Sequence, residues 1–263
     1  MAYSGSLAAL RGSAALAAVV AGMLGGAGQA VLAQQQAPAD GAAPPPRVEM
    51  WSGGEGFPHF WSVHGGATVA PFGGIRDDGF RLRAVLGYGD YYGAGTATAG
   101  DLLIGYHQQH GTVTIKVFAG LTVVDYTPRE PGSVLIGTEH GAKGVLEAWW
   151  NITDEAWASL DLSVSSTHLD YGGRLRLGWR LWPELSAGLE AGSGGMAEGV
   201  FAPDAAAAGQ ALEHDTSRVG AFLRYEWEAG EVSVSGGWAV DGTWREREGG
   251  PGPFGTVSLL TRF

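Results

Sequence analysis

The chain has 263 residues, of which 27 are acidic and 16 are basic, so its formal net charge is -11. This charge argues against a nucleic-acid partner, because binding to nucleic acid needs a basic face. Cysteine is absent, which excludes disulfide bonds, thiolate metal sites and a lipid-modified N-terminal cysteine. Glycine contributes 45 residues without a collagen-like period, and the hydrophobic content of 45% is high enough for a folded chain.

Residues 1–33 have the features of an export signal. Arg11 is the one charged residue among them, and it precedes the apolar run AALAAVVAGMLGG and the short segment Val31-Leu32-Ala33. We expect cleavage near Ala33. The alternative, an N-terminal membrane anchor, is weaker because the run is shorter than the ~20 apolar residues of a spanning helix. Residues 34–47 then form a Pro/Ala/Gln-rich linker, and the folded domain is expected at 48–263.

The folded domain alternates between apolar and polar residues with a period of two, the pattern of β-strands. In TVTIKVFAGLTV every odd-numbered position from Val113 to Val123 is apolar, and in YGGRLRLGWRLW three arginines alternate with apolar residues. The pattern predicts about twelve strands, at 48–55, 60–71, 79–91, 97–108, 111–125, 137–150, 154–166, 169–181, 184–193, 215–227, 231–242 and 252–263.

The predicted connections alternate in length. Tight turns are expected at 110–111, 151–153, 182–183 and 228–230, with long loops between them at 126–136, 194–214 and 243–251. The segment 72–78 is an exception, because it is longer than the other turns predicted at the same end. A soluble β-sandwich also has alternating strands, but short turns at one end and long loops at the other are typical of a membrane barrel.

Aromatic residues support the barrel. On the apolar face, aromatic side chains fall close to the predicted short turns or the C-terminus: Tyr106, Trp150, Trp179, Trp227 and Phe263. Rings in the core of a sandwich would be scattered along the strands, whereas membrane barrels carry girdles at the lipid interface. The sequence therefore predicts an all-β fold, a transmembrane antiparallel up-and-down β-barrel of about 12 strands.

If the apolar face meets lipid, the polar face lines the lumen. The charged candidates for this lining are Arg81, Arg83, Lys116, Lys143, Glu147, Asp161, Arg174, Arg176, Arg180, Glu190, Arg218 and Arg224. Both signs occur on neighbouring strands, and buried charges need partners. One interpretation is a salt-bridged, water-containing interior that holds a small barrel together; the other is a path for a polar or anionic solute.

Candidates for catalysis are few. Some membrane barrels modify lipids with a Ser or Thr nucleophile and a His base on the lipid-facing rim. Ser165, Ser166, Thr167 and His168 are the best candidate for such a cluster, but a solvated loop at the end of a strand is by far the better explanation of these residues. No histidine spacing indicates a metal site, and we expect neither metal nor cofactor.

The ordered segments DDGFRLRAVLGYGDYYG, GDLLIGYHQQHGTVTIKVFAGL and GTEHGAKGVLEAWWN, followed by YGGRLRLGWRLW, resemble the BcsS-type cellulose biosynthesis proteins. The resemblance runs from about Trp51 to Phe263. The chain departs from the family pattern in the insert Ala202–Leu212 and in the charged loop Arg245–Glu248. None of the shared pieces is a catalytic signature.

The resemblance implies a non-enzymatic outer-membrane protein that assists cellulose, an exopolysaccharide of biofilms, in its synthesis or export. The expected partners are outer-membrane lipid, the barrel-assembly machinery, and cellulose or components of the cellulose synthase complex. The alternatives are a general small-solute channel and a lipid-modifying enzyme. The alternating C-terminal strand with Phe263 at its end resembles the signal that the assembly machinery of a Gram-negative outer membrane reads.

Overall fold

The computed structural model describes residues 45–58, 60–91, 95–129, 136–196, 216–240 and 251–263. The predicted signal peptide, most of the linker, and the departures at 202–212 and 245–248 lie outside these residues. Pro46–Phe263 forms one compact unit. Among the described residues, no helix has the length and apolar character needed to cross a membrane.

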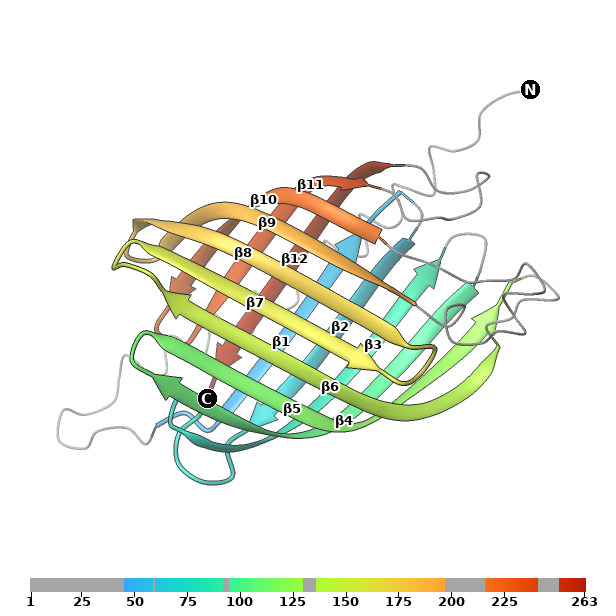
Figure 1. The fold of residues 1–263 in the computed structure, drawn as a ribbon, viewed down its shortest axis with the longest axis horizontal. Coiled ribbons are helices and arrows are strands. Elements are labelled where there is room, and N and C mark those ends of the chain that lie inside the picture. The colour runs from blue at the N-terminus through green and yellow to red at the C-terminus, as the bar shows by residue number, and fades with distance from the viewer. Residues whose placement is uncertain (1–44, 59, 92–94, 130–135, 197–215, 241–250) are drawn as a thin grey trace. The chain divides into compact units, whose positions relative to one another are not determined.

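Twelve strands form this unit, and they match the predicted segments to within a few residues. They are β1 (Val48–Gly56), β2 (Phe60–Val69), β3 (Gly79–Tyr91), β4 (Gly95–His110), β5 (Val113–Pro128), β6 (Gly137–Asn151), β7 (Ala156–Ser165), β8 (Asp170–Trp182), β9 (Leu185–Met196), β10 (Thr216–Trp227), β11 (Gly230–Val240) and β12 (Gly252–Arg262). Each strand pairs antiparallel with its sequence neighbours, and β1 pairs with β12, so the sheet closes into a barrel (Figure 1). The predicted fold class is confirmed.

The two ends of the barrel differ. Val48 and Arg262 lie at one end, which we call the terminus end, and four of the five turns there are short, at 111–112, 152–155, 183–184 and 228–229. The fifth, 70–78, is the segment that blurred the sequence pattern. The opposite end, the loop end, carries the longer connections at 129–136, 197–215 and 241–251, together with short ones at 57–59, 92–94 and 166–169.

The outer surface of the barrel is apolar. Large exposed side chains alternate along the strands, as in Leu82 (50% exposed) and Leu86 (72%) on β3 or Leu102 (70%) and Ile104 (57%) on β4. Such a surface is unstable in water and is the one that a spanning barrel presents to lipid. The outward aromatic residues near the terminus end include Tyr106, Trp150, Trp179, Trp182 and Phe263.

The C-terminus completes the barrel wall. β12 pairs with β1 from Glu49↔Arg262 to Gly56↔Gly255, which leaves neither strand with a free edge. The backbone of Phe263 continues the ladder, because its carbonyl oxygen accepts from the amides of Arg47 and Val48 and its amide donates to Val48. Its ring is 54% exposed on the outer face. Its proposed part in barrel assembly stays a prediction.

Candidate functional site in the barrel lumen

The strand register decides which side chains point into the lumen. Directly paired residues of an antiparallel sheet share a face, and the pairs Arg83↔Leu103, Lys116↔Glu147 and Arg176↔Glu190 lie on the face opposite the exposed apolar residues. Eleven of the twelve predicted lumen candidates share this face within the barrel. The twelfth, Arg180, lies at the terminus end, where its guanidinium donates to the carbonyl oxygen of Asp154 and to Asn151.

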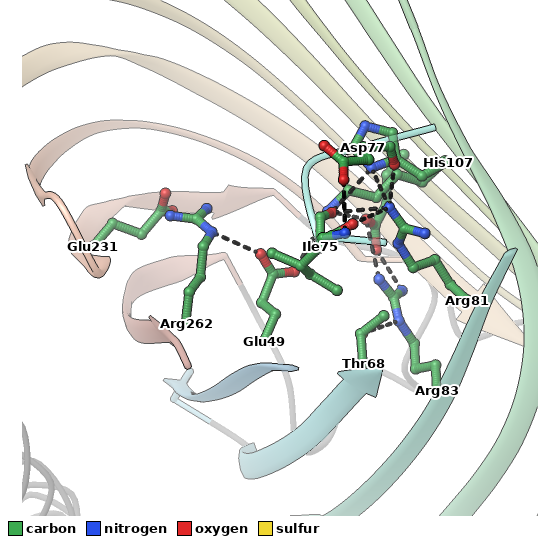
Figure 2. Close-up of polar contacts among 12 residues, drawn as sticks. Glu49, Thr68, Ile75, Asp77, Arg81, Arg83, His107, Glu231 and Arg262 are labelled. Atoms are coloured by element: carbon green, nitrogen blue, oxygen red, sulfur yellow. Dashed lines mark hydrogen bonds and ion pairs between the residues drawn. The ribbon is translucent and has the colours of Figure 1, made fainter. Parts of the chain in front are cut away.

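Ion pairs join distant strands across the terminus half of the lumen. Arg83 on β3 contacts Glu147 on β6 at 2.5 Å, and only 6% of the Arg83 side chain is exposed. Lys116 on β5 lies 3.4 Å from Glu49 on β1 and 3.7 Å from Glu147. Arg262 on β12 is 3.1 Å from the other oxygen of Glu49. Residues from β1, β3, β5, β6 and β12 are thus connected through one network, part of which is shown in Figure 2.

A second network joins β8, β9, β10 and β1. Arg176 on β8 donates to Glu190 on β9 at 2.6 Å, and the Glu190 side chain is completely buried. Arg218 on β10 contacts both Glu190, at 3.6 Å, and Glu55 on β1, at 2.7 Å. A charge this deeply buried needs several partners, because the loss of its hydration is costly, and here each group has them.

The remaining basic candidates on the lumen face are also paired. Arg224 contacts Glu226 and Glu231, Lys143 lies 2.7 Å from Asp101, and Arg174 lies 2.9 Å from Asp161. The charges of the lumen candidates are therefore largely neutralised by their ion-pair partners, which does not favour a path selective for anions.

Arg81 differs because it binds the backbone of a turn. Its guanidinium donates to the carbonyl oxygens of Gly74, Ile75 and Asp77 in the connection between β2 and β3. The ring of His107 on β4 is 3.2 Å from both Arg81 and the Ile75 carbonyl (Figure 2). Ile75 is 4% exposed, and its amide donates to the carbonyl of Pro46.

Within residues 70–78 only Ala70, Gly74 and Ile75 are buried, whereas Phe72 is 75% exposed. We call this segment the plug turn, because Ile75 packs against the inward Arg81 and His107 at the terminus end of the barrel.

Aromatic rings on the inner face lie flat on glycines of the neighbouring strand. Five directly paired positions follow this rule: Trp51↔Gly66, Phe118↔Gly105, Trp157↔Gly178, Phe222↔Gly188 and Phe254↔Gly237. A methyl group added at Gly178 would lie 2.3 Å from the Trp157 ring, so the glycine makes room for the indole. This packing explains why glycine occupies these five of the 45 glycine positions in the chain.

Arginines lie over these same rings. The guanidinium carbon of Arg83 is 3.7 Å from the centroid of the Phe118 ring, and that of Arg176 is 4.9 Å from Phe222. Arg218 lies over Phe254 and Arg224 over Trp157, at 5.3 Å in both cases. Each arginine is thus held between a carboxylate and a ring, an arrangement that fixes a buried guanidinium.

Burial changes along the lumen. In the terminus half many inward side chains are almost inaccessible, as for Arg81 and Trp157 (1% each), although Lys116 and Glu147 keep 23% and 27% of their side-chain surface exposed. In the loop half, Asp161 and Arg174 are 37% and 34% exposed although they face inward, and His64 is exposed as well. The terminus half is therefore packed, and solvent reaches the loop half.

The candidate cluster around His168 lies on the lumen side. The His168 ring packs edge-on against Tyr126 with centroids 5.0 Å apart, and its Nε2 is 3.2 Å from Glu139. His168 and Leu169 both have positive φ, 48° and 49°, which places a strained turn here. The hydroxyls of Ser165 and Thr167 bond to each other at 2.5 Å. The described residues contain no group of acidic or histidine side chains suited to a metal ion.

The alternation also places Asp101 and Glu226, the partners of Lys143 and Arg224, on the polar face. Four other charged residues of these ion pairs were missed from the sequence: Glu49, Glu55, Glu231 and Arg262. Three of them lie on strands whose alternation is weak or begins at a turn. Arg262 had a usable signal, because it directly precedes the outward Phe263 and must therefore point inward.

Comparison with solved structures shows the barrel fold. An outer-membrane channel from Pseudomonas putida F1 superimposes with a TM-score of 0.50 and 12% identity over 86% of this chain and 99% of the channel. The KdgM porin in complex with disordered oligogalacturonate gives 0.48 and 12% over 82% and 99%, and LpxR from Salmonella typhimurium gives 0.47 and 10% over 82% and 100%. At these identities the likeness concerns the fold alone.

Comparison with curated proteins found no match in sequence. The protein-family comparison gave one match, to the cellulose biosynthesis protein BcsS, over residues 50–263. This span includes almost the whole described barrel, with the plug turn, the second charge network and all of the first network except Glu49. The chain belongs to the BcsS family of cellulose biosynthesis proteins.

Proposed function

We propose that the protein is a non-enzymatic accessory protein of the outer membrane that assists the synthesis or export of bacterial cellulose. Family membership over residues 50–263 supports the link to cellulose. The apolar outer surface of a closed barrel supports the membrane, and a cleaved signal at 1–33 would direct the chain there.

One observation carries the structural part of this proposal: the ion pairs that join non-adjacent strands across the lumen of the terminus half. The contacts Arg83–Glu147 and Lys116–Glu49 connect strands separated around the barrel by at least two others. A polymer passing through this half would have to break them. We therefore infer that the barrel acts on cellulose from its loop end, as a scaffold, with its terminus half closed.

The contacts of His168 give no support to a lipid-modifying enzyme. Such chemistry needs a histidine and a hydroxyl at the surface that meets lipid. The His168 ring instead packs on Tyr126 and faces Glu139, both on the lumen side of the wall.

A small-solute channel is the second candidate function. The solvent-exposed Asp161–Arg174 pair favours it, because water and small polar molecules can reach this depth from the loop end. The plug turn opposes a channel because it blocks the terminus end. Measurement of single-channel conductance distinguishes a small-solute channel from a scaffold with a closed terminus half.

Deletion of the gene tests the cellulose proposal. We expect extracellular cellulose, measured as acid-resistant glucan, to fall or to change its attachment to the cell, and a plasmid copy of the gene to restore it. The lipid A profile should stay as in the parent strain. Unaltered cellulose in the deletion strain would refute the proposal, and a changed lipid A would favour the enzyme.

A further inference from the structure

His107 lies between the barrel wall and the plug turn. Its side chain on β4 is 4% exposed, and its Nδ1 atom is 3.2 Å from both the Arg81 guanidinium on β3 and the Ile75 carbonyl oxygen in the plug turn (Figure 2). That arginine also donates to the carbonyl oxygens of Gly74, Ile75 and Asp77. One buried imidazole is therefore in contact with the plug turn and with the arginine that holds it.

The hydrogen-bonding groups around the ring suit a neutral imidazole. Nδ1 faces a donor, Arg81, and an acceptor, the Ile75 carbonyl, and a neutral ring bonds to one of them according to its tautomer. Nε2 is buried and has no hydrogen-bond partner among the described residues. A protonated ring carries hydrogen on both nitrogens, so Nδ1 can no longer accept from Arg81 and the Nε2–H group is left without an acceptor. An unpaired buried donor costs free energy.

The charged groups around the ring also disfavour a second proton. Arg81 lies 3.2 Å away, and Lys116 on β5 is the directly paired residue on the same inner face. The carboxylate of Glu49 is 3.4 Å from Lys116 and offsets part of its charge. Asp78 in the plug turn attracts a charged ring, but its carboxylate already accepts from the backbone amide of Gln109. The two cations act at short range in a packed interior, where like charges repel more strongly than in water.

We propose that His107 makes the plug turn a pH-sensitive gate, which keeps the terminus half closed at neutral pH and releases it in acid. A proton added to the ring places a positive charge beside Arg81 and removes the acceptor at Nδ1, which weakens the hold of the arginine on the turn. Gly73, with a φ of 72°, and Gly74 give the turn the conformational freedom to move. The inference rests on the closed terminus half of the proposed function and adds its regulation.

The direction of the pH dependence follows from the protonation of the ring in the two states. The closed state holds the ring neutral, whereas the open state exposes it to water, where an imidazole has a pKa of about 6.5. The closed state is therefore fully favoured at neutral pH and loses this advantage as the pH falls through that value. Between about pH 7.5 and about pH 5, the ratio of open to closed barrels should rise by up to about 30-fold.

Single-channel recording of the purified full barrel in planar bilayers, at neutral and at acid pH, tests the gate. We expect the native barrel to be closed at neutral pH and to open frequently in acid. His107→Gln keeps a neutral polar side chain but cannot take up a proton, so it should stay closed at both. Any response of carboxylates such as Glu49 or Glu147 persists in this variant, so loss of the acid openings assigns them to the imidazole.

His64→Gln is the matched control, because His64 is also an inward histidine but lies exposed in the loop half. It should open in acid as the native barrel does, and heat-modifiable mobility should show that each variant is folded. A native barrel that stays silent in acid, or acid openings that persist in His107→Gln, would overturn the gate and leave the closed scaffold in place. Steady conductance at neutral pH would overturn the closed terminus half and the gate together, whereas unaltered cellulose on gene deletion would refute the link to cellulose and leave the gate standing.

Discussion

Replacing Arg83 by leucine is expected to lower the free energy of unfolding of the barrel by about 3 kcal/mol, the usual cost of removing one partner from a buried ion pair. The substitution takes from Glu147 its closest cation, at 2.5 Å, and from Thr68 a donor at 3.0 Å. It also removes the guanidinium that lies 3.7 Å from the centroid of Phe118. Lys116 remains near Glu147 and limits the loss. Urea unfolding in lipid vesicles, followed by tryptophan fluorescence, measures the change.

Arg174→Leu is the control, because Arg174 is also an inward arginine with a carboxylate partner. Its pair with Asp161 is about one-third exposed on both sides, and exposed pairs contribute about 0–1 kcal/mol. Equal losses for the two substitutions would show that the terminus half is as wet as the loop half, which contradicts the packed interior.

Gly178→Ala is expected to destabilise the barrel by about 3 kcal/mol or to prevent its assembly. This is the top of the usual range for overpacking a core, because the ring has no room to move. The new methyl would lie 2.3 Å from Trp157, which is 1% exposed. Trp157 also stacks on Trp149 at 4.1 Å and packs in a tilted arrangement against Phe222 at 5.4 Å, so its displacement would disturb several strands. Heat-modifiable mobility reports assembly, and urea unfolding reports stability.

Gly87→Ala provides the comparison for this substitution. Gly87 is also an inward strand glycine, but a methyl there meets no atom closer than 3.8 Å. Its stability should stay within about 0.5 kcal/mol of the native value, as for a substitution without steric conflict. If the Gly178→Ala and Gly87→Ala variants were equally stable, the contact with a ring would not explain why glycine lies opposite the inner aromatic residues.

The fold could be predicted from the sequence because the signal is repeated twelve times. Alternation assigns each side chain to a face, and short turns such as Trp182-Pro183 set the antiparallel order. Strand ends were less certain. The segment 60–71 was predicted too long, because Ala70 leaves the ladder to begin the plug turn, where its amide donates to the carbonyl of Arg47.

The contacts across the lumen could not be predicted. The periodicity places Lys116 on the inner face, but it cannot tell that Glu49 lies opposite, because barrel closure and strand tilt decide which inward residues meet. The weak alternation of the segment 48–55 likewise does not assign Trp51 to a face. In the structure it faces inward, with the guanidinium carbon of Arg83 5.8 Å from its ring centroid.

The glycine–aromatic pairs could not be predicted from the sequence for a different reason. Phe118 occupies a position of the polar face, so the alternation treats it as an exception. Only the register shows that it lies opposite Gly105, where a side chain would clash with its ring at 2.3 Å. An aromatic residue on the polar face, with a glycine-rich neighbouring strand, is the sequence signal that could have found these pairs.

Single-channel recording in planar bilayers tests the closed terminus half most directly. We expect the native barrel to give no steady conductance, and Arg81→Ala to give frequent openings, because it releases the plug turn from its contacts with Gly74, Ile75 and Asp77. Arg180→Ala, at the outer edge of the same end, should stay silent. Steady, porin-like conductance of the native protein would contradict the closed lumen and would favour a small-solute channel.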